Sequence, residues 1–204
     1  MRRFLVLLPL ILGFAFVNIA GAAGTARVDL TATPTISVTG VTRVCQGEVP
    51  YARLNLLVNL PDKGRPGLVY VGSHDPAQTV AEFFYEGQWT TWDGGLYPPH
   101  LIVRNGLNDV TLYVPYDRLV DKLGWRLYVG YGVLTAEDEQ KVQRMIQSYQ
   151  IAKTKLPDRQ IPTVDPDHFR RVLIQMNMTD NVKYRYVTEW TSDLSGLCVT
   201  SSGS

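Results

Sequence analysis

The sequence predicts a mainly β protein: an antiparallel β-sandwich with one amphipathic helix after a Tyr-Val-Gly-Tyr-Gly strand and a short C-terminal helix-strand extension. Three observations lead to this fold class. Short runs of alternating apolar and polar residues recur along the chain, and turn residues separate these runs about every 8 to 12 residues. The apolar spacing becomes helical only after residue 134. Many short strands with regular turns are typical of a sandwich or barrel.

The first strands are expected within 27–60, where Leu54, Leu56, Val58 and Leu60 share one parity. Residues 61–67 are rich in Pro and Gly and read as a turn. The same alternation and turn signals predict the remaining strands at 68–75, in a hairpin over 80–92 that turns at Glu86-Gly87, at 108–117, at 125–133 and at 182–190.

Two helices are expected near the C-terminus. Thr135 is a good N-cap with acidic residues after it, and Pro157 ends the helix. Its apolar stripe should pack on the sheet and consists of Val142, Met145, Ile146 and Tyr149. Asp165-Pro166 opens the second helix, whose buried stripe is predicted to be Phe169, Val172, Leu173 and Met176. Gly130 and Gly132 in the preceding strand allow a bend or the close approach of another backbone.

The N-terminus has the pattern of a secretory signal. Two arginines precede an apolar run, and Ala20-Gly21-Ala22 matches a signal peptidase site. The expected organisation is a signal peptide at 1–22, a sandwich domain with its helix at 23–156, and an extension at 157–204. Export by the Sec route implies the periplasm, the cell surface or the extracellular space. No later apolar run is long enough for a membrane span.

The charge of the mature chain is close to neutral. Residues 1–22 hold two of the 20 basic residues, which leaves 18 basic against 19 acidic residues. Because binding to phosphate backbones needs clustered positive charge, nucleic acid is not an expected partner.

Cys45 and Cys198 are the only cysteines of the chain. An even count in an exported protein favours a disulfide, which would tie the first strands to the last part of the chain. The loop closed would be about 150 residues long, for which chain entropy gives roughly 5 kcal/mol before strain. Metal binding and a catalytic thiol are disfavoured, because there is no C-x-x-C pair and no histidine nearby.

No catalytic, metal or cofactor site emerges from the motifs. The sequence Ser73-His74-Asp75-Pro76 resembles a triad fragment but reads better as a turn, because no nucleophile elbow accompanies it. Glu82 and Glu86 leave a glycosidase-like carboxylate pair open. No cofactor is expected.

Aromatic residues are dense between 85 and 131, and they either fill the sandwich core or form a binding platform. Trp89 and Trp92 differ in parity, so one is expected in the core and the other outside. We expect Trp89 to be the core residue, on the parity of Phe83 and Tyr85, and Trp92 to be exposed. The predicted binding residues are Trp92, Tyr97, His100 and Tyr116.

The order FYEGQWTTWDGGLYPPH, RLYVGYG and a capped helix ending in MIQSYQI resembles a recurring module of exported bacterial proteins, similar to those in cell-surface and pilus-associated proteins. The resemblance covers Leu54 to Ile151 and carries over no catalytic residue. It implies a non-catalytic exported structural or interaction protein, with a protein partner or self-assembly at the cell surface or in a filament. The alternative is a carbohydrate- or peptide-binding module that uses an aromatic surface. A secreted hydrolase is the third hypothesis.

Overall fold

The structure is a computed structural model that describes residues 33, 36–46, 49–115, 122–156 and 161–189. Three sequence predictions therefore lie outside the described residues: the signal peptide at 1–22, the binding residue Tyr116, and Cys198 as the partner of Cys45.

Nine strands, one 3-10 helix and two α-helices make up the described part of the chain. In order they are β1 (Ser37–Gln46), β2 (Val49–Leu57), η1 (Leu60–Asp62), β3 (Gly67–His74), β4 (Ala81–Tyr85), β5 (Gln88–Thr91), β6 (Leu101–Val103), β7 (Val110–Pro115), β8 (Arg126–Val133), α1 (Ala136–Lys155), α2 (Pro166–Asp180) and β9 (Tyr184–Glu189). Neither helix in this described part is long and apolar enough to cross a membrane.

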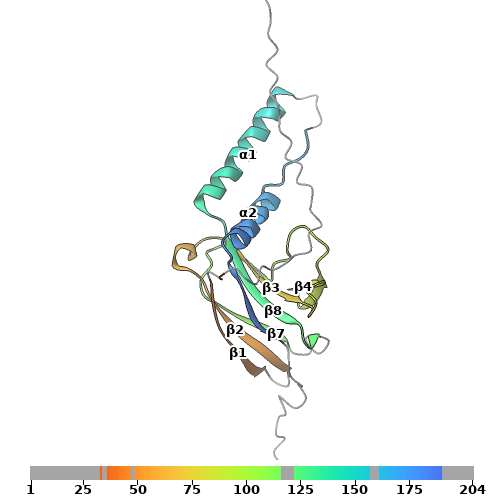
Figure 1. The fold of residues 1–204 in the computed structure, drawn as a ribbon. Coiled ribbons are helices and arrows are strands. Elements are labelled where there is room, and N and C mark those ends of the chain that lie inside the picture. Colours follow the sequence, from red (N-terminus) through yellow and green to blue (C-terminus); the bar gives the residue numbers. More distant parts are fainter. Residues whose placement is uncertain (1–32, 34–35, 47–48, 116–121, 157–160, 190–204) are drawn as a thin grey trace, which may run out of the picture.

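The strands form two antiparallel sheets, which confirms the predicted fold class. The first sheet has the order β1-β2-β7. The second sheet, called the large sheet here, has the order β5-β4-β3-β8-β9, and β6 pairs with one end of β3. The two sheets face each other, and the helices lie beyond the large sheet (Figure 1). Within the predicted C-terminal extension, β9 pairs with β8 and so continues the large sheet.

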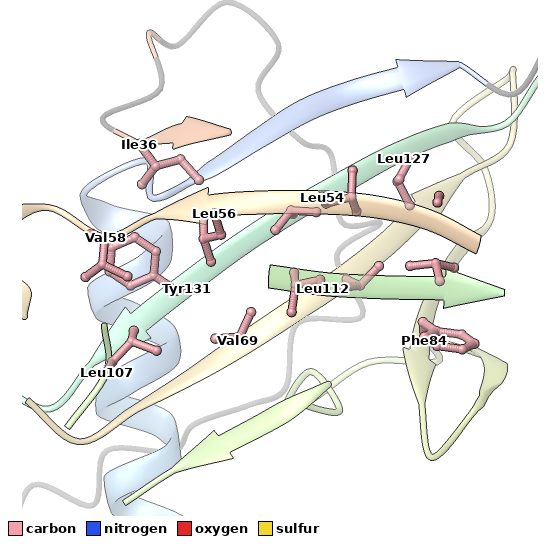
Figure 2. Close-up of a cluster of buried hydrophobic side chains, with 14 of the residues drawn as sticks. Ile36, Leu54, Leu56, Val58, Val69, Phe84, Leu107, Leu112, Leu127 and Tyr131 are labelled. Carbon is pink, nitrogen blue, oxygen red and sulfur yellow. The ribbon is translucent and has the colours of Figure 1, made fainter. Parts of the chain in front are cut away.

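The main core lies between the sheets, where alternate residues of each strand point inward. Figure 2 shows Leu54 and Leu56 of β2 and Leu112 of β7 facing Val69 of β3 and Leu127 of β8. All five are 3% exposed or less. The parity predicted for β2 is confirmed at Leu54, Leu56 and Val58, whereas Leu60 is exposed because η1 begins there.

The opposite, outer face of the large sheet carries α2. Gly132 is the closest point, because a Cβ placed there would lie 2.0 Å from the backbone oxygen of Ile174. At Gly130 a Cβ would lie 2.9 Å from the Lys183 backbone oxygen and 2.9 Å from the Met178 sulfur. The expected close approach of another backbone at these glycines is therefore present. The buried residues of α2 are Leu173, Ile174 and Met178. The prediction that Met176 points inward is wrong, since it is 49% exposed.

The first helix packs mainly on α2, so the packing predicted for its apolar stripe is confirmed only in part: Val142 and Ile146 belong to the same apolar cluster as Leu68 of β3. The Thr135 hydroxyl accepts the Asp138 amide proton at 3.0 Å, which confirms the predicted cap. Val142 is the one buried residue of α1, while Met145, Ile146 and Tyr149 are half-buried. The reason is visible in Figure 1: α2 already occupies the outer face, and α1 extends past it away from the sheets.

An ion pair joins the two helices near their N-terminal ends. The Arg170 guanidinium donates to both oxygens of the Glu139 carboxylate, at 2.9 and 2.8 Å. This interaction lowers the pKa of Glu139 to about 2. The geometry is bidentate, which is the arrangement in which an arginine orients its partner most strongly.

A buried polar cluster ties four elements together beside the main core. The Lys183 ammonium contacts Asp62 of η1 at 2.8 Å and the Asn177 side-chain oxygen of α2 at 3.0 Å. The Tyr131 hydroxyl of β8 donates to the same Asp62 carboxylate at 2.8 Å. Asn177 also accepts the Val133 amide proton at 3.1 Å. Buried charges need such partners, so this cluster fixes α2 against β8 and the start of β9.

The close approach at Gly132 generates a test of the fold. Gly132→Ala places a methyl group against the Ile174 backbone, so the helix must shift, and overpacking of this kind costs about 1–3 kcal/mol or more of unfolding free energy. Denaturant unfolding measures this loss. Gly72→Ala is the matched control, because its Cβ would meet its nearest neighbours at an ordinary 3.4 Å. Equal losses of unfolding free energy in the two variants would contradict the described position of α2 on the sheet.

Candidate functional site

A cavity of about 180 Å³ opens on the outer face of the large sheet beyond the C-terminal turn of α2. The helix ends at Asp180, so it covers only one end of that face. The other end carries His74 and Tyr128, which both line the cavity. The remaining wall is mostly aromatic and includes Tyr70, Phe83, Tyr97 and Tyr184.

The space exists because tyrosine and glycine alternate across β3 and β8. Tyr70 is paired with Gly130, and Gly72 is paired with Tyr128. Gly72 leaves open the room that a side chain would take, whereas Gly130 lets Met178 and Tyr184 approach the sheet closely. The two tyrosine rings form walls beside these glycines. All four residues line the cavity. The floor of the cavity is therefore formed by the sheet itself, while the end of α2 and the loop that carries Tyr97 form its sides.

Tyr97 forms the side of the cavity opposite to β8. Its ring stacks on Phe83 at 4.7 Å between centroids and meets Tyr70 edge to face at 6.0 Å. Its backbone amide donates to the Gln175 side-chain oxygen of α2 at 2.7 Å. Trp92 packs against Tyr97 at 5.2 Å. Trp92 and Tyr97, predicted separately as binding residues, thus belong to one cluster, and Tyr97 is the one that lines the cavity.

The hairpin places Trp89 and Trp92 on opposite faces, as predicted, but the parity used to assign them was wrong. Glu86 and Gly87 have φ values of 49° and 78° and form a two-residue turn. Such a turn pairs Phe84 with Trp89, so the tryptophan shares the inner face with Phe84 and packs against the main core. Trp92 is half-buried on the outer face beside Tyr97, and is less exposed than expected.

The other predicted site residues lie elsewhere. His100 is half-buried and stacks on Phe84 at 5.5 Å, on the inner side of the large sheet. It does not join Trp92 and Tyr97 at the cavity. Cys45 is exposed near the end of β1, and because Cys198 lies outside the described residues, the disulfide stays a prediction.

His74 is a buried polar residue of the cavity that sequence reasoning did not place at a binding site. It is 7% exposed, its ring meets Tyr128 edge to face at 5.4 Å, and its Nδ1 has no hydrogen-bond partner. Burial lowers its pKa, with Asp75 opposing and Arg126 reinforcing the shift. The alternation of 68, 70, 72 and 74 on the outer face is the signal that could have found it.

The Ser73-His74-Asp75 sequence does not assemble a triad. Ser73 and His74 are successive residues of β3, so their side chains point to opposite faces of the sheet. Asp75 instead accepts the backbone amide protons of Thr79 and Val80 at 2.6 and 2.7 Å, which confirms the turn. The predicted carboxylate candidate Glu82 is paired with Lys122. Glu86 is exposed in the hairpin turn.

The cavity is a largely apolar pocket, and the carboxylate in its lining, that of Glu82, is paired with Lys122. Burial raises the pKa of Tyr70, and Arg171 only partly opposes this, so the phenol stays protonated. Burial likewise raises the pKa of Tyr97. In the described part of the chain no group of three His, Cys, Asp or Glu side chains lies close enough to hold a metal ion. The arrangement can hold an uncharged ring or aliphatic group by contact.

The two buried histidines generate a test by pH. Burial is the largest cause of the lowered pKa at both His74 and His100, so the unfolded chain takes up protons at a higher pH than the folded protein. The free energy of unfolding should therefore fall as the pH is lowered from about 7.5 to about 5.5. Carboxylates such as Glu139, whose pKa is about 2 in the folded protein, stay ionised in both states over this pH range. Their contribution to the free energy of unfolding is lost only at lower pH.

Denaturant unfolding at both pH values measures this change. His74→Gln should reduce the pH dependence, and the double variant with His100→Gln should remove it. The exposed residue His168 supplies the control, because His168→Gln should leave the dependence as it is. A dependence unchanged in the double variant would show that other groups cause it.

Comparison with known proteins adds no assignment. No protein-family model, curated protein or solved structure matches the chain. The resemblance to exported bacterial modules therefore stays a hypothesis, and the site rests on its geometry.

Proposed function

We propose that this is a non-catalytic exported interaction protein, and that its cavity receives one aromatic or large aliphatic side chain of a partner protein. The observation that carries the proposal is the cavity on the outer face of the large sheet, walled by Tyr70, Phe83, Tyr97 and Tyr128. The signal-like N-terminus and the module resemblance support export, with a place at the cell surface or in a filament.

The size of the cavity favours a side chain over a free metabolite. Pockets for drug-sized ligands measure about 300–1,000 Å³. The cavity here is about 180 Å³, which is close to the size of an apolar cavity of about 150 Å³ that holds a benzene ring. A single buried anchor residue surrounded by weaker contacts is the usual arrangement at protein interfaces.

The surroundings of the cavity supply those weaker contacts. Tyr186 of β9 is 43% exposed and is paired with Tyr128, so both lie on the outer face. On the opposite side, Tyr85 of β4 is 36% exposed and shares the parity of Phe83. An apolar rim on both sides of an apolar pocket fits a protein surface.

A sugar ring is the second candidate, because Trp92 and Tyr97 form a half-exposed aromatic pair. A sugar needs hydrogen bonds for its hydroxyl groups as well as a ring to stack on. The wall around Tyr97 is mostly apolar, which favours the side chain of a protein.

The proposal is tested with probes that stand in for side chains. Toluene and p-cresol, which mimic Phe and Tyr, should shift the amide NMR signals of Gly72 and Gly130, while methyl glucoside should not. Gly72→Ala adds one methyl group to the cavity at a position with ordinary contacts. It should weaken binding of both ring probes about tenfold or more, since one methyl in an apolar pocket is worth about 1–3 kcal/mol.

Leu60→Ala is the control variant, because Leu60 is 82% exposed in η1, which does not line the cavity. It should leave the binding of both ring probes unchanged. Ring probes that leave the Gly72 and Gly130 signals unmoved would overturn the proposal. Shifts caused by methyl glucoside at Trp92 and Tyr97 would favour the sugar-binding function instead.

A further inference from the structure

The buried polar cluster contains an amine beside a side-chain amide, with a carboxylate on the amine. Lys183 is 7% exposed and Asp62 is 8% exposed. The Lys183 Nζ lies 3.0 Å from the Asn177 Oδ1 and 2.8 Å from the Asp62 Oδ2. Primary amines attack carbonyl carbons once they lose a proton, and an amide can be the group attacked.

We propose that Lys183 and Asn177 join in an intramolecular amide bond that the protein forms by itself. The Lys183 Nζ attacks the Asn177 Cγ, so that a new Nζ–Cγ bond forms and the Cγ–Nδ2 bond breaks. The Lys183 ammonium releases two protons in this exchange, one to Asp62 before the attack and one after it, and both end on the Nδ2, which leaves as an ammonium ion. The step involves no oxidation or reduction and needs no further reactant.

The neighbouring groups supply the parts that such an acyl transfer needs. Asp62 accepts the proton of the attacking amine across the 2.8 Å contact and passes it to the leaving nitrogen. The Val133 amide donates to the Asn177 Oδ1 at 3.1 Å, where negative charge develops when the carbon is attacked. The Tyr131 hydroxyl, which donates to Asp62 at 2.8 Å, holds the carboxylate in place.

Burial keeps water away from the reacting groups, since Lys183 and Asp62 are both nearly inaccessible to solvent. The ring of Tyr131 lies 5.6 Å from the Lys183 Nζ and forms part of the apolar surroundings. Burial is also the main cause that raises the pKa of Tyr131, so its phenol remains a proton donor toward Asp62.

The backbone holds the two reacting residues together. The Lys183 amide donates to the Met178 oxygen at 2.8 Å, and the Lys183 oxygen accepts the Tyr131 amide proton at 2.9 Å. The lysine is thus fixed between the end of α2 and β8. Groups held in this way react as if present at very high concentration. The bond would lock the α2–β9 connection covalently, and it does not depend on what the cavity binds.

Trypsin digestion of the full-length protein, unfolded in denaturant, followed by mass spectrometry tests the proposal. Arg171 and Arg185 flank the two residues, and Lys183 is a cleavage site only while its amine is free. The linked protein gives one peptide covering 172–185, lighter than its sequence by the mass of one ammonia molecule. Cleavage after Lys183, with both products at full mass, would overturn the proposal.

Two variants serve as controls, and one side reaction must be distinguished from the amide bond. Lys183→Arg keeps the positive charge but removes the amine, and Asp62→Asn removes the proton acceptor, so both variants should show the full mass at Asn177. A succinimide at Asn177 also loses ammonia, yet it leaves Lys183 cleavable and persists in Lys183→Arg. A mass loss with that behaviour would count against the amide bond.

Discussion

The buried contact between Lys183, Asp62 and Asn177 is the interaction on which the rest of the arrangement depends. It joins η1, α2 and the start of β9, and through the Tyr131 hydroxyl it reaches β8 in the main core. Removing one partner of a buried ion pair typically costs about 3–5 kcal/mol, because the other charge is left without compensation. The cluster therefore fixes α2 on the sandwich, and the Glu139–Arg170 ion pair joins α1 to α2.

The position of α2 decides where the cavity lies. Gly132 and Gly130 let the helix approach the sheet closely, and Asp180 ends it before it covers His74 and Tyr128. A bulky residue at either glycine would lift the helix and open the outer face to water. The same glycine-tyrosine alternation continues beyond the helix at Gly72 and Tyr128, where it leaves an aromatic cavity in place of a helix contact.

Local signals in the sequence predicted most helices and strands, but they could not predict the contacts between elements that lie far apart in the sequence. Alternation, turn residues and the Thr135 cap placed most strands and both helices, because these depend on neighbouring residues. The faces of Trp89 and Trp92 were assigned from the wrong parity, since a two-residue hairpin turn reverses it. Lys183 falls within the strand predicted at 182–190, and nothing local marks it as a buried residue. It is buried because Asp62, more than a hundred residues away, supplies its partner.

The central claim is that α2 has a fixed position on the large sheet. Hydrogen exchange at the Val133 amide tests this claim most directly. That amide proton is held by the Asn177 side chain, so it is released whenever α2 leaves the sheet. If the helix and the large sheet open as one unit, the Val133 amide should exchange as slowly as that of Val129 in the core of β8, at the free energy of global unfolding. Fast exchange at Val133 beside a protected Val129 would contradict the account, because α2 would then detach from a sandwich that stays folded.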